Sequence, residues 1–220
     1  MSCVILVPVK DRAFAKSRMG PFLSAEERSL VATAMLDDLI RALLPLVFPV
    51  AVVTNSQQIA TRIAKLGWRV LWEEEQLSES SSIDAASTRL ADEGAQAVLR
   101  LPADLPLIQT DDVTELCLET PQAPSAVLAP SWDGTGTNAL LRTPPNLFPS
   151  HFGPGSFALH TENARLVGAQ LRVVHNSRLA LDLDDVADIA RFLSSPTECE
   201  TYRTLMDLNV KERLARHAFP

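Results

Sequence analysis

Short apolar, β-branched runs alternate regularly with segments of helical periodicity along most of this chain. Residues 3–9 form one such run, which suits a strand buried on both faces of a parallel sheet. Residues 24–45 carry an apolar stripe at helical spacing, and Ser24 and Glu27 have capping-box spacing. The alternation continues with expected strands at 50–54, 68–72 and 95–101 and expected helices at 56–66, 82–93 and 111–118. This pattern predicts an α/β fold with a Rossmann-like, doubly wound, mostly parallel sheet.

The last third of the chain departs from this alternation. Residues 126–129 and 138–142 flank a glycine-rich loop, which predicts an antiparallel hairpin inserted into the sheet. A further strand is expected at 171–175 and two closing helices at 184–194 and 198–208, the second with capping-box spacing at Thr197 and Glu200. Because no repeat, low-complexity tract or interdomain linker is visible, residues 1–220 are expected to form a single domain.

Charge and cysteine content exclude several classes of protein. A formal net charge of −7 argues against nucleic-acid binding, because neutralising a phosphate backbone needs clustered Lys and Arg. Cys3, Cys117 and Cys199 are scattered, so neither a disulfide framework nor a cysteine zinc site is indicated. The longest apolar run, 42–53, is broken by two prolines and is too short to cross a bilayer, and no targeting segment is visible. A cytoplasmic protein without a membrane partner is expected.

A basic loop follows the first expected strand, at the sheet edge where ligands of open α/β folds bind. Lys10, Lys16 and Arg18, with Arg12 between them, offer point charges and bidentate forks. Such groups would clamp a triphosphate and stabilise charge on a transferring phosphoryl group. The alternative is a solvated surface loop.

Three aspartates are candidate magnesium ligands. Asp104 follows an apolar strand in a turn between two prolines, where a carboxylate is a natural Mg²⁺ ligand or, alternatively, stabilises its own turn. Asp182 and Asp184 alternate with leucines and would project to one face of an extended chain. Because two like charges so near each other repel, they favour a bound cation. Asp184 or its neighbour Asp185 could alternatively cap the next helix.

Two glycine-rich stretches are candidates for anion binding. The first precedes a helical segment, so Gly153, Gly155 and Ser156 are expected to present N–H groups to a phosphate or carboxylate. The second, residues 133–138, lacks the lysine of a phosphate-binding loop, and a plain hairpin turn is favoured there. The four histidines have no metal-ligand spacing and are interpreted as solvated or structural, and no nucleophile stands out.

Together these motifs resemble the 2-phospholactate guanylyltransferase family of the MobA-like nucleotidyltransferases. The resemblance rests on stretches that occur in the family's order along most of the chain: Val7-Pro-Val-Lys10 with Ala15-Lys-Ser-Arg18, Leu101-Pro-Ala-Asp-Leu-Pro-Leu107, Asp133-Gly-Thr-Gly-Thr137, Phe152-Gly-Pro-Gly-Ser156 and Leu181-Asp-Leu-Asp184. It implies a nucleotide-diphospho-sugar transferase-like fold and a role in making an early intermediate of the deazaflavin coenzyme F(420).

The resemblance also implies a reaction and a set of residues. GTP and a small phosphorylated carboxylic acid would give a guanylylated diphosphate and pyrophosphate, with Mg²⁺ bound by Asp104, Asp182 and Asp184. Lys10, Lys16 and Arg18 would contact phosphates and, with Asp104, form the catalytic set. The segments that would contact the acceptor contain Thr137 with Asn138, Gly153 and Ser156. A homodimer is one assembly left open, and a downstream transferase would receive the diphosphate product.

Base readout is expected from the loops around Thr54 and Ser82. Relatives often carry Gly-Leu-Asn after the third strand, whereas this chain has Ser82-Ile83-Asp84, a departure that affects contacts in this region. The family's acceptors are 2-phospho-L-lactate, phosphoenolpyruvate and 3-phospho-D-glycerate. The departures favour 3-phospho-D-glycerate.

In the resulting hypothesis, Mg²⁺ bridges the α-phosphate of GTP and the acceptor phosphate, and an acceptor oxygen displaces pyrophosphate. No general base is required, because the acceptor phosphate is already a nucleophile. One alternative is a nucleotidyltransferase that acts on a sugar phosphate or a molybdopterin-type cofactor. An alternative of another class is a non-catalytic GTP-binding regulator.

Overall fold

The structure, a computed structural model, describes residues 3–9, 17–74, 77–118 and 122–217. Lys10 and Lys16 lie outside the described residues, so their phosphate contacts stay predictions. Within the described ranges, no helix has both the length and the apolar character needed to cross a membrane.

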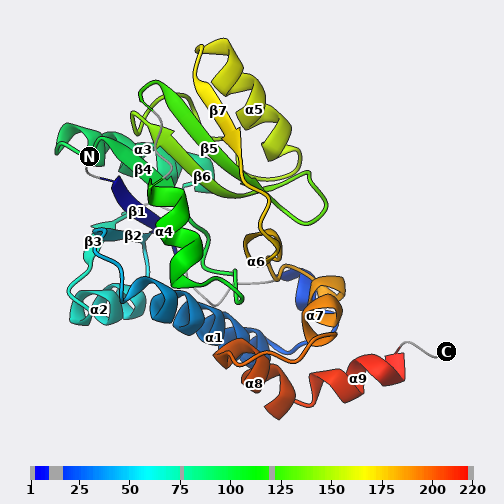
Figure 1. The fold of residues 1–220 in the computed structure, drawn as a ribbon. Helices are drawn as coiled ribbons and strands as arrows, with labels where there is room; N and C mark the ends of the chain where they lie inside the picture. Colours follow the sequence, from blue (N-terminus) through cyan, green and yellow to red (C-terminus); the bar gives the residue numbers. More distant parts are fainter. Residues whose placement is uncertain (1–2, 10–16, 75–76, 119–121, 218–220) are drawn as a thin grey trace.

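A mixed sheet runs through the described part of the chain, with seven strands in the order β3-β2-β1-β4-β6-β5-β7 (Figure 1). The strands are β1 (Cys3–Pro8), β2 (Val50–Thr54), β3 (Arg69–Trp72), β4 (Ala97–Arg100), β5 (Ser125–Pro130), β6 (Thr137–Thr143) and β7 (Gln170–Val173). All neighbours are parallel except β6, which runs antiparallel to both β4 and β5. The mostly parallel sheet and its antiparallel insertion are therefore confirmed.

The helices connect these strands much as the periodicity predicts. They are α1 (Ala25–Leu43), α2 (Gln57–Lys65), α3 (Glu79–Asp92), α4 (Thr110–Leu118), α5 (Ser156–Leu166), α6 (Ser177–Ala180), α7 (Val186–Leu193), α8 (Glu200–Asp207) and α9 (Val210–His217), with a short 3-10 turn η2 (Ser17–Met19). The capping box of α1 is confirmed, because Ser24 and Glu27 each bond the other's backbone N–H. Helix α3 begins earlier than expected because the Ser78 hydroxyl caps it through the N–H of Ser81.

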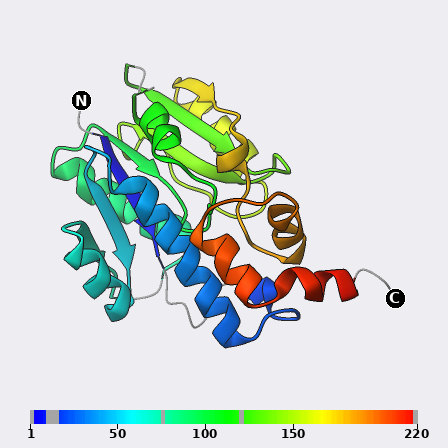
Figure 2. The same ribbon diagram turned by 60° about the horizontal axis from the view of Figure 1, so that its bottom comes forward.

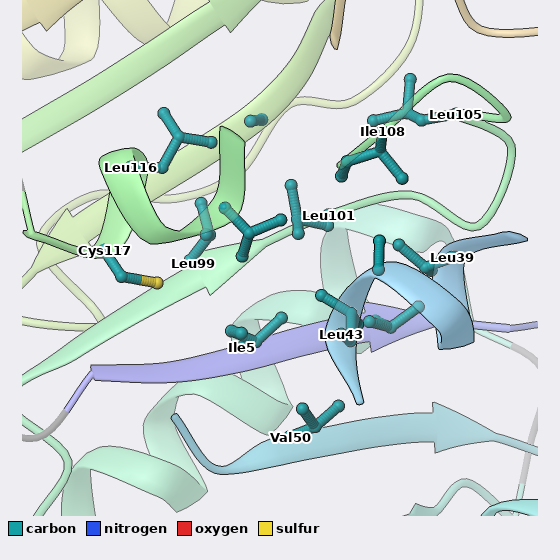
Figure 3. Packing of buried hydrophobic residues seen from close by; sticks show 14 of the residues in the cluster. Ile5, Leu39, Leu43, Val50, Leu99, Leu101, Leu105, Ile108, Leu116 and Cys117 are labelled. Carbon is teal, nitrogen blue, oxygen red and sulfur yellow. The ribbon is translucent and has the colours of Figure 1, made fainter. Parts of the chain in front are cut away.

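Strand β1 is buried on both faces, as its apolar sequence predicts. Ile5 and Val7 pack with α1, α2 and α4, whereas Val4 and Leu6 face the opposite side and pack with α3. Figure 3 shows the first face, where leucines of α1 and α4 gather over β1 and β4. Because helices cover both faces, the loops at the carboxyl edge of the strands are free to build a site.

A second core joins the two ends of the chain. Met19 and Leu23 pack with Leu181, Leu183 and Phe192. Figure 2 shows the consequence, with α8 lying along α1 and α9 continuing from it. This packing places the η2 turn next to the 181–184 segment.

The end of the chain differs from expectation in two respects. The predicted cap at Thr197 is wrong: the N-cap of α8 is Cys199, and buried Asp38 of α1 accepts the N–H groups of Glu200 and Thr201 at 2.7 and 2.8 Å. This cap lies far away in sequence, so no local pattern predicts it. Helix α9 was also not predicted, and Asn209, in a left-handed conformation with φ of 53°, separates it from α8.

Candidate active site

A pocket of about 640 Å³ opens at the carboxyl end of β4. Because β6 is antiparallel to β4, the start of β6 lies beside the end of β4, and Leu140 pairs with Arg100. The pocket gathers candidate residues from four separate stretches of the chain and from η2: Arg18, Asp104, Thr137, Asn138, Gly153, Ser156, Asp182 and Asp184. Most of the described residues predicted from the sequence therefore meet at one place.

The loop after β4 and the 181–184 segment are joined directly. The N–H of Leu183 donates to the carbonyl oxygen of Asp104 at 3.1 Å. Leu181 and Leu183 are buried, while Asp182 and Asp184 line the pocket, which is the alternation that the sequence predicts. This backbone contact sets Asp104 beside Asp182.

The charges of Asp104 and Asp184 affect the pKa of Asp182. Burial raises the pKa of Asp182 to about 6, the charge of Asp104 adds to that rise, a hydrogen bond from Asn138 opposes it, and Asp184 contributes a smaller increase. A carboxyl group held in this way is destabilised in its charged form, and a nearby cation would relieve the repulsion.

Asp184 and Asp185 have different roles. Asp185 caps α7, because its carboxylate accepts the N–H groups of Ala187 and Asp188 at 2.8 and 3.0 Å. The helix cap that the sequence left open between the two residues is therefore Asp185. Asp184 instead lies 3.6 Å from the guanidinium of Arg18, a solvent-exposed pair that contributes little to stability.

Two carboxylates, rather than a complete set of protein ligands, are available to bind magnesium. Among the described residues, no three His, Cys, Asp or Glu side chains are arranged to hold a metal ion by themselves. Mg²⁺ commonly takes only one or two carboxylates and completes its shell with water and substrate phosphates. Asp104 and Asp182, whose charges already repel each other, provide such a pair. Magnesium binding stays a prediction.

Asn138 contacts protein groups through its amide. Its Nδ2 lies 2.9 Å from the carbonyl oxygen of Leu179, 3.0 Å from that of Ala180 and 3.0 Å from Oδ1 of Asp182. The side chain thus ties the start of β6 to the aspartate segment. These contacts give the residue a role in positioning Asp182, in addition to its predicted place at the substrate.

A chain of hydrogen bonds orients the hydroxyl of Thr137. Nε2 of buried His160 accepts the N–H of His151 at 2.9 Å, so the proton of the neutral imidazole is on Nδ1, 3.0 Å from Oγ1 of Thr137. The hydroxyl of Ser156 donates to the same oxygen at 3.3 Å. Because Oγ1 of Thr137 accepts both bonds, neither of them uses its own hydrogen. His160 is structural, as the sequence suggests.

Acid is expected to destabilise the protein through His160. Burial lowers the pKa of His160 to about 3, and the charges of Arg142 and Arg100 add to this effect. The unfolded chain binds a proton near pH 6.5, so the contribution of this residue is fully present above that pH and is lost as the pH falls toward about 3. Between about pH 7 and pH 4, the free energy of unfolding should fall by roughly 3 kcal/mol from this residue alone.

Urea unfolding at a series of pH values checks this expectation. His160→Gln should flatten the pH dependence below about pH 6, whereas His175→Gln, at an exposed position, should leave it unchanged. Identical pH profiles for the wild type and His160→Gln would contradict the assignment.

The glycine-rich stretch before α5 uses some of its N–H groups in hydrogen bonds within the protein. Gly155 is the N-cap of α5, with φ of 75°. The N–H of Ser156 donates to the carbonyl oxygen of Gly153, and that of Phe157 donates to Thr135. Both donors of Ser156 are used within the protein, so its anion contact stays a prediction, and Gly153 lines the pocket as expected.

Thr54 and Ser82 contact other protein groups. Thr54 is buried, and its hydroxyl accepts the N–H of Ser56. Ser82 lines a different pocket, of about 340 Å³, and its hydroxyl bonds the carboxylate of Glu73. Neither residue is among those that line the pocket of Asp104 and Asp182, so their role in base readout stays a prediction. The neighbouring Asp84 is structural, because it pairs with Arg142 at 2.9 Å and accepts both polar hydrogens of Ser150.

Several pocket residues are not predicted from the sequence. Arg100 and Glu79 form an ion pair in the wall of the pocket, and Arg191 lies over the ring of Trp132 at 4.3 Å. A signal existed for Arg100, since a charge inside an apolar strand must be paired or must line a site. Glu79 and Arg191 lie on helices with ordinary polar faces, which give no such signal.

Comparison with known proteins finds one protein family and several guanylyltransferases that are similar to this chain. A family model described as guanylyl transferase CofC like matches residues 3–217. The chain is 36% identical over 195 residues to the phosphoenolpyruvate guanylyltransferase of Rubrobacter xylanophilus, which covers 89% of this chain and 95% of that protein. It is 31% identical to the 3-phospho-D-glycerate guanylyltransferase of Colwellia psychrerythraea, over 89% of this chain and 94% of that protein.

Two further similarities agree with this result. The 2-phospho-L-lactate guanylyltransferase of Methanothermobacter thermautotrophicus is 31% identical, over 88% of this chain and 85% of that protein. A crystal structure from Desulfovibrio desulfuricans G20, described as a nucleotide-diphospho-sugar transferase, superposes with a TM-score of 0.79 at 18% identity and covers 97% of this chain and 98% of that one. The structural similarity shows a shared fold.

Proposed function

The chain belongs to the guanylyl transferase CofC-like family, and from this premise we propose that it transfers the guanylyl group of GTP to a small phosphorylated acid. The acid would carry a phosphate and a carboxylate on three carbons, and the product would be a mixed diphosphate in coenzyme F(420) biosynthesis. The observation that supports this reaction best is the meeting of Asp104 and Asp182 with Thr137 and Ser156 in one pocket.

In the proposed reaction, a phosphate oxygen of the acceptor attacks the α-phosphorus of GTP. The new phosphorus–oxygen bond forms as the bond to the β-phosphate oxygen breaks, and pyrophosphate leaves with that electron pair. The acceptor phosphate needs no general base, so the protein mainly aligns the two substrates and neutralises their charge. Mg²⁺, held by Asp104 and Asp182, would supply part of that neutralisation.

The residues around this centre have separate tasks in the proposal. Asn138 holds Asp182 in place through its amide. Arg18, close to Asp184, would meet the triphosphate together with Lys10 and Lys16. The hydroxyl of Thr137 already accepts two hydrogen bonds and would donate a hydrogen bond to the acceptor carboxylate.

The acceptor is one of a small set. The departures at 82–84 favour 3-phospho-D-glycerate, while the relative with 36% identity is a phosphoenolpyruvate guanylyltransferase. These acids differ in planarity and in the separation of carboxylate from phosphate. A panel that includes both acids and 2-phospho-L-lactate distinguishes them.

The proposal predicts pyrophosphate release from GTP with at least one acid of this panel. Mass spectrometry should find the corresponding guanylylated acid, and ATP or CTP should be poor replacements for GTP. Chelation of divalent ions with EDTA should stop turnover, and added Mg²⁺ should restore it. Product formation only with a sugar phosphate or a pterin would favour the related nucleotidyltransferases. GTP binding without pyrophosphate release for any acceptor would contradict an enzymatic function.

A further inference from the structure

Arg100 is a charged residue at the end of an otherwise apolar strand. Ala97, Val98 and Leu99 of β4 are buried in the core, and Arg100 itself is only 6% exposed. An arginine keeps its charge even when buried, so the surroundings must compensate for the lost hydration. The side chain lines the pocket of Asp104 and Asp182.

The contacts of the guanidinium hold it in one orientation. Nη1 lies 3.2 Å from the carbonyl oxygen of Thr137, and the guanidinium carbon lies 4.0 Å from the centre of the Phe152 ring. Nη2 bonds the carboxylate of Glu79, whose side chain is 36% exposed and lines the same pocket. Nε is buried and has no hydrogen-bond partner. These contacts fix the positive charge in the pocket wall.

The pocket is lined by charges of both signs. Asp104 and Asp182 are partly buried acidic groups in its wall, and a backbone hydrogen bond from Leu183 to Asp104 joins their two segments. Arg100 lies beside Thr137 and Phe152, and its charge also lowers the pKa of His160. An acid that carries a phosphate and a carboxylate offers a partner to each kind of charge, with its phosphate toward a cation held by the aspartates and its carboxylate toward Arg100.

We propose that Arg100 is a specificity-determining residue that selects acceptors carrying a carboxylate. This inference rests on the proposed function and deepens it. The carboxylate of Glu79 occupies Nη2 of Arg100 in the structure and competes with the acceptor carboxylate for the same positive charge. Removing the cation should therefore weaken acceptor binding, and removing the competing anion should strengthen it.

The test uses the full-length enzyme with GTP and Mg²⁺. Wild type, Arg100→Met, Arg100→Lys and Glu79→Gln are each assayed with 3-phospho-D-glycerate and with glycerol 3-phosphate, which keeps the phosphate and lacks the carboxylate. Whichever panel acid the wild type prefers can replace the first substrate, paired with its analogue without the carboxylate. The readouts are kcat/KM for each acceptor and KM for GTP.

Arg100→Met should lower kcat/KM for the acid on the order of 10- to 100-fold, because a hydrogen bond to a charged group is lost. The same variant should change kcat/KM for the analogue and KM for GTP by less than about threefold, because neither depends on the carboxylate. Arg100→Lys should fall in between, since it keeps a charge without the planar fork. Glu79→Gln should lower KM for the acid.

Arg142→Met serves as the matched control. Arg142 is also a buried arginine, pairs with Asp84 and is not among the residues that line this pocket. This variant should lower stability without changing the ratio of kcat/KM between the acid and its analogue.

Two results would overturn the proposal for Arg100. One is an unchanged ratio in Arg100→Met; the other is an equal loss for the acid, the analogue and GTP, which would indicate a purely structural residue. If Arg100→Met does not fold, an unchanged ratio in Arg100→Lys together with a higher KM for the acid in Glu79→Gln is decisive against it. A wild type that makes no product with any acid would instead refute the proposed function.

Discussion

Replacing Asp182 with Asn is expected to abolish guanylyl transfer and, at the same time, to stabilise the metal-free protein. Asn keeps an oxygen that can accept the hydrogen bond from Asn138 but removes the negative charge. Loss of a metal-binding carboxylate should lower kcat roughly 1,000-fold, since it removes charge neutralisation at the reacting phosphates. Asp104→Ala should have a similar effect on turnover.

The raised pKa of Asp182 determines the sign of the expected change in the free energy of unfolding. The folded-state pKa of Asp182, about 6, lies above the value of 3.8 for an unperturbed Asp. Above that range, the charged carboxylate therefore destabilises the folded state, and the penalty disappears as the pH falls from about 6 toward 4. At neutral pH, Asp182→Asn should gain roughly 1–3 kcal/mol, equivalent to a few degrees in Tm.

Thermal melts with and without Mg²⁺, together with a pyrophosphate assay, check both parts. Mg²⁺ should raise Tm for the wild type and leave Asp182→Asn unchanged. Asp92→Asn, at an exposed position of α3, is the matched control and should keep both turnover and Tm. Turnover above a tenth of the wild-type value in Asp182→Asn, or a lower Tm, would contradict the role assigned to this carboxylate.

Replacing Asn138 with Ala is expected to damage both stability and turnover. The amide of Asn138 bonds two backbone carbonyls and Asp182 at 2.9 to 3.0 Å, and the residue is buried. Its removal leaves buried acceptors without their donor, at a cost of about 2–3 kcal/mol in the free energy of unfolding. Turnover should fall roughly 100-fold, because Asp182 loses the group that orients it.

Urea unfolding and steady-state kinetics separate the two effects. Asn138→Asp should be the more severe variant, since it places a further carboxylate against Asp182. Asn163→Ala removes an amide whose Nδ2 lies 3.3 Å from the carbonyl oxygen of Pro149, and it should behave like the wild type. A wild-type kcat in Asn138→Ala at saturating substrates would exclude the positioning role.

Local patterns predicted most of the fold because the relevant signals lie within one element. The apolar run at 3–9 and the helical stripe at 24–45 correspond to β1 and α1, and the hairpin around the glycine-rich loop corresponds to β5 and β6. The failures have physical causes as well. Helix α8 takes its cap from Asp38, which lies 162 residues away from Glu200, and no local pattern records such a partner.

In the candidate site, too, some features follow from neighbouring residues and others depend on the packing of distant segments. The alternation of Leu181 and Leu183 with Asp182 and Asp184 is a property of neighbouring residues, so the direction of both carboxylates followed from the sequence. The ion pair of Arg100 with Glu79, 21 residues apart, depends on how β4 and α3 pack. The same holds for the bond from Asn138 to Asp182, 44 residues apart.

Residue patterns along the chain are enough to predict the type of each main element, the inward or outward direction of its side chains and the family to which the motifs belong. The position of β6 between β4 and β5, and with it the choice of polar partners in the pocket, follows from the folded arrangement of the strands alone. The physical reason is that periodicity reports which face of an element is buried, whereas the identity of a partner depends on strand order and on packing between distant segments.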